Sequence, residues 1–154
     1  MDYSFAVAGF VFTASLSENV ITSLAWHKGE TAPASATNSV PASLLRAELA
    51  AYFSGRLQKF TVPYRCEHPS AYYQAVWKEL ANIPYGQTTS YKAIAEKLST
   101  HPRGVARACA ANPLPLIIPC HRVLAATGAL SGYSGAGGIA TKRRLLDLER
   151  DHRA

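Results

Sequence analysis

The sequence predicts an α/β protein: a small N-terminal antiparallel sheet with one helix, followed by a mostly helical C-terminal part. Three patterns lead to this prediction. Residues 4–26 alternate apolar side chains with small or polar ones, as short half-buried strands do. Residues 42–57 carry apolar side chains at helical spacing, and Gly55 marks the end of that helix. From Ser70 onward the chain changes to short helical patterns separated by Pro and Gly turns.

The length of 154 residues allows one domain or two small ones that share an interface. A stretch rich in Ala, Ser, Thr and Pro over residues 31–42 predicts a flexible loop, and residues 60–69, with two prolines, predict an extended connector. We place the boundary inside this connector. The prediction is an N-terminal α/β domain over residues 1–66 and a second domain over residues 67–154.

The second domain begins with three predicted helices. Ser70 can cap the first helix, and Thr89 or Ser90 can cap the second. The third helix covers residues 103–111 and ends at Asn112-Pro113, because the residue before a proline disfavours the helical conformation. Two short helices joined by a brief turn fit a helix-turn-helix. Many helix pairs bind no nucleic acid, so the pattern alone leaves the function open.

A glycine-rich stretch and a final helix complete the chain. The glycines of residues 128–138 surround Tyr133 and permit close approach to a ligand, but the stretch lacks the Gly-Lys-Ser/Thr of a phosphate loop. Residues 141–152 then predict a helix that turns Leu145, Leu146 and Leu148 to the core. This helix also carries Glu149, and a Glu late in a helix is usually a solvated residue.

Positive charge is concentrated in one segment of the chain. The formal net charge is +6, but residues 85–144 hold eight basic side chains against Glu96 alone, and the rest holds eight basic and nine acidic ones. Such a bias predicts a surface that faces a polyanion; a solvated basic face is the alternative on charge alone. The eight basic residues are Lys92, Lys97, Arg103, Arg107, Arg122, Lys142, Arg143 and Arg144.

Composition also excludes several classes of protein. No apolar stretch approaches the length of a membrane span, and the N-terminus lacks the basic start of a signal peptide, so we expect a cytoplasmic protein without membrane contact. The three cysteines, Cys66, Cys109 and Cys120, are an odd number without CxxC spacing, which argues against a disulfide framework. Cys66 and His68 lack a second ligand pair at metal-site spacing, so we expect no metal.

The stretch from Asn112 to Val123 carries the strongest chemical signal. Residues 114–118 form a short apolar run that predicts a strand buried on both sides, although periodicity alone does not exclude a helical segment. Pro119 ends the run and places Cys120 at the mouth of a core. A free cysteine is most often a small buried hydrophobe. The neighbours His121 and Arg122 favour a reactive thiol instead, because a thiolate needs a nearby base or positive charge.

The run Pro119-Cys120-His121-Arg122-Val123 resembles the acceptor-site signature of the O6-alkylguanine-DNA alkyltransferases. The likeness covers residues 72–149 closely and includes Asn112-Pro113, Gly128, residues 132–135, Lys142, Leu145-Leu146 and Glu149. It implies DNA repair by direct reversal of damage. A monomer would transfer the alkyl group of O6-alkylguanine in double-stranded DNA irreversibly to its own cysteine, once per molecule and without a cofactor. Activity on O4-alkylthymine and the preferred alkyl size stay open.

The resemblance implies a role for each residue of the catalytic site. Cys120 is the acceptor, and His121 acts as its base through a bound water, while Glu149 orients the imidazole. Tyr133 donates a hydrogen bond or proton to the leaving purine. Asn112 ties the turn between the recognition helix and the active-site strand.

The resemblance also implies the contacts to substrate and DNA. The backbone carbonyl of Val123 accepts from the guanine amino group, and Ser134 lines the pocket. Arg103 enters through the minor groove into the space left by the flipped base, and Tyr91 crowds the target phosphate. The alanines of the third helix suit a close approach to the minor groove without a sequence code. Two further basic side chains are expected at the DNA, namely Arg107 and Arg122.

The sequence departs from the family pattern at two places. Cys109-Ala110-Ala111 lacks a basic-glycine pair, which removes a phosphate contact, and residues 135–138 contain extra glycine-loop residues that affect pocket size. Zinc ligands and the metal-binding domain of adaptive-response regulators are absent, so we expect a stand-alone repair module.

Two alternative functions remain from the sequence. One is a non-catalytic sensor or helix-turn-helix regulator that binds alkylated DNA, and the presence of Cys120 argues against it. The other is a cysteine hydrolase using Cys120, His121 and Glu149, which would need an oxyanion hole and turnover.

Overall fold

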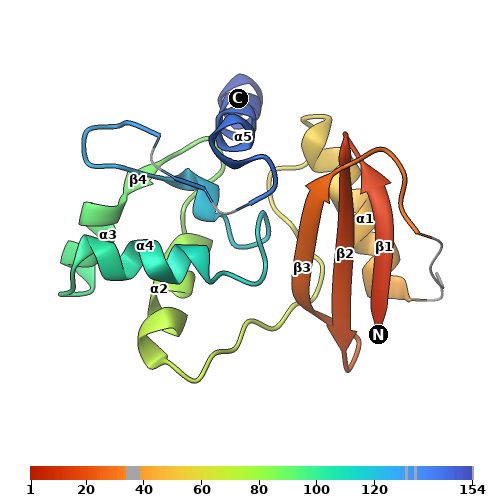
Figure 1. Ribbon diagram of the computed structural model, residues 1–154, viewed down its shortest axis with the longest axis horizontal. Helices are drawn as coiled ribbons and strands as arrows, with labels where there is room; N and C mark the ends of the chain where they lie inside the picture. The colour runs from red at the N-terminus through yellow and green to blue at the C-terminus, as the bar shows by residue number, and fades with distance from the viewer. Residues whose placement is uncertain (34–38, 131, 134, 154) are drawn as a thin grey trace.

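A computed structural model describes residues 1–33, 39–130, 132–133 and 135–153. The N-terminal part is an antiparallel sheet of order β1-β2-β3, formed by β1 (Asp2–Val7), β2 (Phe10–Ser17) and β3 (Val20–Lys28). Helix α1 (Val40–Phe53) packs against this sheet, and Figure 1 shows it behind the strands. The predicted sheet and helix are therefore confirmed. The helix begins two residues earlier and ends four residues earlier than predicted, and Gly55, with a φ of 80°, follows its C-terminal cap.

The sheet builds one side of the hydrophobic core. Its inward-facing aromatic and aliphatic side chains, such as Phe12 and Ile21, are fully buried against Leu45, Leu49 and Tyr52 of α1. The three α1 residues are spaced by four and three positions, which places them on one helix face. The core cluster continues into the C-terminal helices without interruption. The division at residue 66 stays a prediction.

The edge of β3 joins the two parts of the chain. The backbone of Ile21 exchanges hydrogen bonds with the connector, donating to Pro63 and accepting from Arg65, each at 2.9 Å. The backbone N–H of Leu24 donates to the carbonyl of Pro113 at 2.8 Å. These backbone groups lie at the outer edge of β3 and would otherwise be unpaired. They bond instead to the connector and to the turn that precedes Cys120.

The C-terminal part is mostly helical, as predicted. Helices α2 (Ala71–Ala81), α3 (Tyr91–Lys97) and α4 (Pro102–Ala110) begin after the side-chain caps Ser70, Ser90 and His101, respectively. Helices α3 and α4 pack together as the predicted helix-turn-helix, and α2 packs against α4. Strand β4 (Thr89–Ser90) pairs in parallel with β5 (Val123–Leu124).

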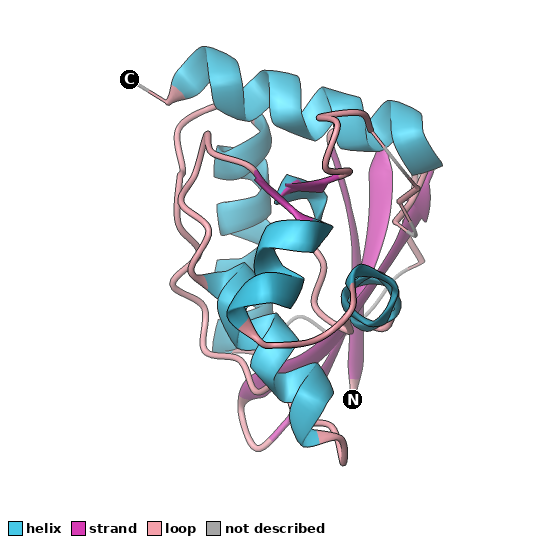
Figure 2. Ribbon diagram, turned by 90° about the vertical axis from the view of Figure 1, so that its left-hand side faces the viewer, coloured by secondary structure: helices cyan, strands magenta, loops and turns pink. Residues whose placement is uncertain are grey.

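The last helix, α5 (Gly138–His152), begins three residues earlier than predicted. Figure 2 shows it running across one end of the molecule, above the other helices and the sheet. Leu145 is fully buried, while Leu146 and Leu148 are only partly buried. The polar residues Lys142 and Glu149 are buried as well. Every helix in the described ranges is too short or too polar to cross a membrane.

The strand predicted over residues 114–118 is wrong. These residues are buried but form an irregular turn, in which the Ile118 N–H donates to the Leu114 carbonyl at 2.8 Å and Leu116 adopts a positive φ of 72°. Prolines at positions 113, 115 and 119 lack the N–H groups that a regular ladder needs. Apolar content therefore predicted the burial correctly, while the prolines prevented the strand.

Candidate active site

Cys120 lies in a cleft of about 480 Å³ between the helix-turn-helix and the glycine-rich loop. The cleft brings together three residues that the sequence predicted to act with it: Tyr91, Arg103 and Tyr133. The remaining lining is small or apolar and comprises Pro102, Ala106, Cys109, Ala110 and Gly132. A flat apolar molecule with a polar edge, such as a purine, matches this combination of walls.

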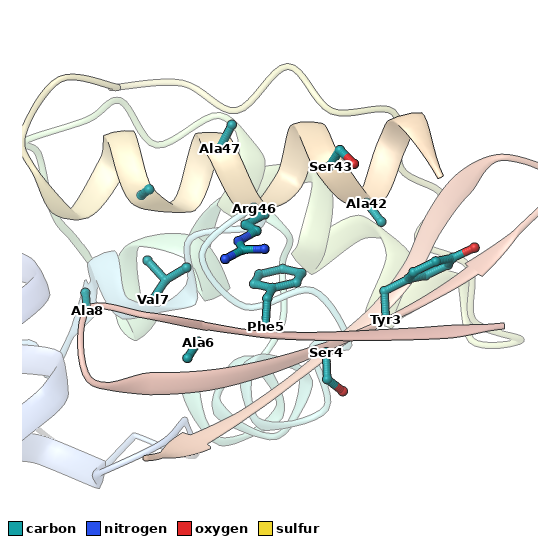
Figure 3. A pocket seen from close by; sticks show the side chains of 11 residues that line it. Tyr3, Ser4, Phe5, Ala6, Val7, Ala8, Ala42, Ser43, Arg46 and Ala47 are labelled. Atoms are coloured by element: carbon teal, nitrogen blue, oxygen red, sulfur yellow. The ribbon is translucent and has the colours of Figure 1, made fainter. Parts of the chain in front are cut away.

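A larger cavity of about 650 Å³ lies between β1 and α1. Figure 3 shows Arg46 reaching toward it from α1, above Phe5 and Val7 of β1. Its lining residues include neither cysteine nor histidine. The smaller cleft is therefore the candidate active site, because it alone of these two combines a nucleophile with titratable neighbours.

Cys120 opens a single 3-10 turn, Cys120–Arg122, directly after Pro119. Its side chain is 6% exposed, at the cleft. Burial raises the pKa of the Cys120 thiol, while a hydrogen bond with Asn112 and the charge of Lys142 lower it in part. The net effect is a rise, so the resting group is a thiol and not a preformed thiolate. A base must therefore remove the proton when Cys120 reacts.

Asn112 holds the turn before Cys120 in shape. Its Nδ2 donates to the Ile118 carbonyl at 2.8 Å, and its Oδ1 accepts from the Leu114 N–H at 2.9 Å. Because Asn112 follows the C-cap of α4, Ala111, these bonds connect α4 to the turn that leads to Cys120.

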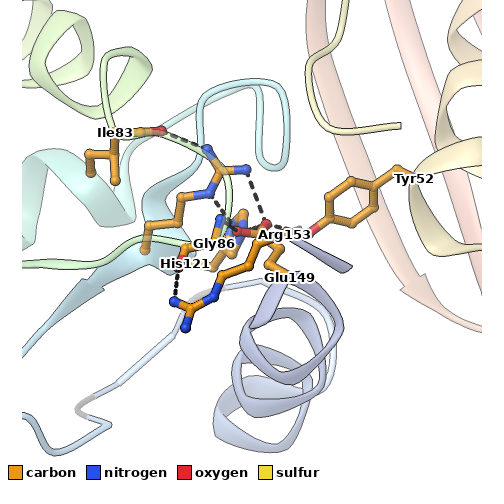
Figure 4. Close-up of polar contacts among 7 residues, drawn as sticks. Tyr52, Ile83, Gly86, His121, Glu149 and Arg153 are labelled. Carbon is orange, nitrogen blue, oxygen red and sulfur yellow. Dashed lines mark hydrogen bonds and ion pairs between the residues drawn. The ribbon is translucent and has the colours of Figure 1, made fainter. Parts of the chain in front are cut away.

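His121 and Glu149 form the centre of a buried hydrogen-bond network (Figure 4). His121 Nε2 and Glu149 Oε2 are 2.6 Å apart, and Arg122 Nε donates to Glu149 Oε1 at 2.7 Å. Burial alone would raise the pKa of Glu149, but the bonds from His121 and Arg122 lower it to about 2. Glu149 is thus ionised at neutral pH and can only accept hydrogen bonds.

This ionised carboxylate fixes the tautomer of His121. Since Glu149 Oε2 only accepts, Nε2 of His121 must carry the proton. Burial lowers the pKa of His121 although Glu149 opposes the effect, so the ring is neutral near pH 7 and Nδ1 holds a lone pair. Nδ1 is buried and makes no hydrogen bond to any residue in the described ranges. His121 therefore has the basic nitrogen that deprotonation of Cys120 requires.

The prediction that Arg122 contacts DNA is wrong. Its side chain is buried, and besides the bond from Nε its Nη2 donates to Glu149 Oε2 at 3.1 Å while its Nη1 donates to the Ile83 carbonyl at 2.7 Å. The 3-10 turn directs the guanidinium inward to α5 instead of toward the cleft. Arg122 balances the charge of Glu149, and a buried carboxylate needs such a partner.

Lys142 is likewise inside the protein, although it belongs to the basic set that the sequence predicted to face a polyanion. Its Nζ donates to the carbonyl of Val123 at 2.7 Å and to that of Gly132 at 3.4 Å, and lies 5.7 Å from the centre of the Tyr91 ring. Lys142 thereby joins β5 to the loop that carries Tyr133. The Val123 carbonyl, predicted to accept from guanine, already accepts one bond and has a second lone pair for a substrate.

Tyr133 forms the wall of the cleft opposite α4. Burial raises the pKa of its phenol well above the usual value, so the hydroxyl remains a donor at neutral pH. This hydroxyl is buried and has no hydrogen-bond partner in the described part of the chain. A side chain at Gly135 would collide with the Tyr133 ring, which explains a glycine there. Ser134, predicted to line the pocket, lies outside the described residues.

The exposed face of α4 has the composition predicted for a close approach to DNA. Arg103 and Arg107 are exposed there, together with the small residues Ala106 and Ala110. Arg103 also lines the cleft, so it can reach both the solvent and the site of Cys120.

Comparison with known families identifies this arrangement. The model of the family "6-O-methylguanine DNA methyltransferase, DNA binding domain" matches residues 71–151, more than half of the chain. The chain belongs to this family. The matched range contains the helix-turn-helix, the Cys120 turn and Glu149.

Relatives extend the family likeness to the N-terminal sheet. The inducible methylated-DNA–protein-cysteine methyltransferase of Bacillus subtilis is 36% identical over 166 aligned positions, covering 97% of this chain and 86% of that protein. The methylated-DNA–protein-cysteine methyltransferase of Mycobacterium tuberculosis is 45% identical over 105 residues, which cover 67% of this chain and 62% of that protein, less than two thirds of its length.

Solved structures show the same fold. The crystal structure of Mycobacterium tuberculosis OGT in complex with DNA superimposes with a TM-score of 0.80 at 36% identity. The superposition covers 97% of this chain and 92% of that chain, so the likeness includes both the sheet and the helical part.

One polar member of the site was missed by sequence reasoning, and the burial of another was not foreseen. Tyr52 of α1 donates from its hydroxyl to Glu149 Oε2 at 2.6 Å, and Lys142, which is part of the family likeness, was counted among the cations that face a polyanion. A signal for Lys142 exists: positions 142, 145 and 149 recur at spacings of three and four, which places Lys142 on the face of Leu145 and Glu149. For Tyr52, spacing predicts burial but gives no sign of the hydroxyl's partner.

Proposed function

We propose that this protein repairs DNA by direct reversal, transferring the alkyl group of O6-alkylguanine in double-stranded DNA to Sγ of its own Cys120. Thiolate sulfur is a soft nucleophile suited to attack on saturated carbon. The transfer forms a carbon–sulfur bond and breaks the bond between the alkyl carbon and O6. The product is a thioether, which has no leaving group for a second cycle, so each molecule reacts once.

The proton follows the path that the buried network allows. His121 takes the proton of the Cys120 thiol on Nδ1, through one bridging water, because adjacent side chains in a tight turn point apart. Glu149 and Arg122 hold the imidazole in the tautomer that leaves Nδ1 free to accept. Tyr133 donates a hydrogen bond to the departing purine. The guanine leaves without its alkyl group and takes up one proton, which balances the proton that the thiol gave to His121.

The proposed DNA contact places α4 in the minor groove. A base inside a duplex is out of reach of a buried thiol, so the damaged guanine must rotate out of the stack. Arg103, at the border of the cleft, would occupy the vacated space, and Tyr91 would crowd the target phosphate. Arg107 would contact the backbone nearby. A reducing cytoplasm suits a protein whose three cysteines are all free thiols.

The observation that supports this proposal most is the shared cleft of Cys120, Tyr133 and Arg103, backed by the His121–Glu149 pair. Intact-mass analysis after incubation with a duplex containing O6-methylguanine tests it. We expect one added methyl group per molecule, mapped to Cys120.

Two variants make this test specific. Cys120→Ser should bind the duplex but gain no methyl group, whereas the matched Cys66→Ser should react as the wild type does, since Cys66 lies outside the cleft and burial raises its pKa to about 11. Methylation of Cys66 or Cys109, or release of product in repeated cycles, would contradict the proposal; the latter would indicate a hydrolase.

A further inference from the structure

The N-terminal helix α1 contributes one hydroxyl group, that of Tyr52, to the buried hydrogen-bond network of His121 and Glu149. Tyr52 is 1% exposed, and its hydroxyl donates to Glu149 Oε2 at 2.6 Å. Figure 4 shows its ring entering from α1 on the side of Glu149 opposite Ile83. Tyr52 lies outside the range of residues 71–151 that the family model matches.

The direction of this hydrogen bond is unambiguous. Glu149 is ionised, so its oxygens only accept, and burial together with the Glu149 charge raises the pKa of the Tyr52 phenol well above its usual value. Tyr52 is therefore always the donor near neutral pH. Glu149 Oε2 accepts from three groups: Tyr52 at 2.6 Å, His121 at 2.6 Å and Arg122 at 3.1 Å. Tyr52 and His121 thus share one oxygen.

Sharing this oxygen has a consequence for His121. Each donor withdraws part of the negative charge that Oε2 offers to the others. A carboxylate that already accepts from Tyr52 stabilises an imidazolium less than a carboxylate without that bond. The same bond fixes Oε2 in position, so the ring of His121, whose Nε2 is bonded to that oxygen, is held in one orientation.

We propose that Tyr52 is a positioning residue for alkyl transfer, acting through Glu149 to orient His121 and to limit its basicity. The inference rests on the proposed role of His121 as the base for Cys120. It makes the N-terminal part of the chain a contributor to the reaction, in addition to its structural role.

Titration of His121 by NMR, in protein without substrate, tests the proposal. In Tyr52→Phe the aromatic ring stays and only the hydroxyl is lost. We expect the His121 pKa to rise by roughly half a unit, because Oε2 then accepts one hydrogen bond fewer.

The other titratable groups near His121 and Glu149 are Tyr85 before α3, Cys120 and Arg122 in the 3-10 turn, and Lys142 of α5.

Tyr85→Phe is the matched control. The Tyr85 ring lies edge-on to that of Tyr52 at 6.3 Å, and its buried hydroxyl makes no hydrogen bond to the described residues. Removal of this hydroxyl should leave the His121 pKa unchanged. An unchanged His121 pKa in Tyr52→Phe, or an equal shift in both variants, would overturn the proposal.

The pH dependence of alkyl transfer gives a second readout. The rate should fall on the acid side as His121 becomes protonated, and in Tyr52→Phe this fall should move to higher pH by the same half unit, with less than about a threefold change on the plateau. A purely structural contact would lower the rate equally at every pH. That uniform loss would contradict the proposal even if the duplex is still repaired.

A fluorinated tyrosine at position 52 keeps the test informative if Tyr52→Phe folds poorly. Fluorine next to the hydroxyl makes the phenol a stronger donor without removing the bond. The His121 pKa should then shift in the opposite direction, downward. Because this titration needs no alkylated DNA, its outcome is independent of whether Cys120 accepts an alkyl group, and the two proposals can fail separately.

Discussion

The basic segment of residues 85–144 contains two groups of cations that have opposite surroundings. Arg103 and Arg107 are exposed on α4, where they can pair with phosphates or enter a groove. Arg122 and Lys142 are buried: Arg122 donates to Glu149, and Lys142 donates to the carbonyls of Val123 and Gly132. Identical charges in one stretch of sequence therefore have two surroundings: the exposed pair is free to contact a polyanion, as we propose, and the buried pair orders the site around Cys120.

The difference follows from the cost of burying a charge. A cation inside a protein is tolerated only when an anion or carbonyl groups satisfy it, so it is held in one geometry. An exposed cation on a surface helix keeps its hydration and contributes little to folding. We therefore expect substitutions in the two groups to separate cleanly into effects on stability and effects on DNA.

The largest expected effect is on stability, in Arg122→Met. This change leaves the Glu149 carboxylate buried without its cation, which typically costs about 3–5 kcal/mol. The matched exposed variant, Arg107→Met, should change the free energy of unfolding by less than about 0.5 kcal/mol. Urea unfolding of both proteins measures the difference, and equal losses would remove the distinction between the two groups.

The stability of the folded protein at low pH should depend on the same buried network. The pKa of Glu149 is lowered from 4.5 to about 2 in the folded protein, so its contribution to stability is present above pH 4.5 and is lost as the pH falls toward 2. The full contribution is about 3 kcal/mol for a shift of this size. Unfolding measured between pH 6 and pH 2 should show this loss in the wild type and a smaller loss in Glu149→Gln; identical slopes would contradict it.

Alkylation of Cys120 should produce a smaller destabilisation. An added carbon in a packed site costs about 1–3 kcal/mol, and each kcal/mol lowers the melting temperature by roughly 2–4 °C for a chain of this length. Strain at Cys120 should pass through Asn112 to α4 and weaken DNA binding. Melting curves and duplex affinities of the unmodified and methylated protein decide this. A methylated form that melts higher and binds equally well would disprove it.

The smallest expected effect is that of Arg107→Ala on undamaged duplex. Loss of one phosphate contact should weaken binding to all sequences about equally and reduce the salt dependence of log K by roughly one charge. Lys78→Ala, which changes an exposed lysine on α2 outside the cleft, is the control. A sequence-dependent loss in Arg107→Ala would indicate base contact instead.

Local patterns in the sequence predicted the order of the elements well. Alternation predicted a small antiparallel sheet of short strands at the N-terminus, and Ser70 and one of Thr89 or Ser90 marked the starts of two helices, because such side chains satisfy free backbone N–H groups. The cleft residues Cys120, Tyr133 and Arg103 were also predicted, by resemblance.

What the sequence could not predict was long-range pairing. Tyr52 and Glu149 are separated by 97 positions, and Arg122 points inward because of a three-residue turn that has no sequence signal. The apolar run before Cys120 was predicted as a strand because its composition fits one, yet its prolines allow no ladder.

We propose that the exposed cations of residues 85–144 serve DNA contact, whereas the buried cations of the same segment serve the chemistry at Cys120. The most direct test compares the transfer rates with an O6-methylguanine duplex and with free O6-benzylguanine, which needs no base flipping, in Arg103→Ala and Arg122→Lys. We predict that Arg103→Ala slows the duplex reaction by at least about tenfold and leaves the free-base reaction nearly unchanged, whereas Arg122→Lys slows both reactions equally. Equal losses in Arg103→Ala, or a loss confined to the duplex in Arg122→Lys, would contradict the account.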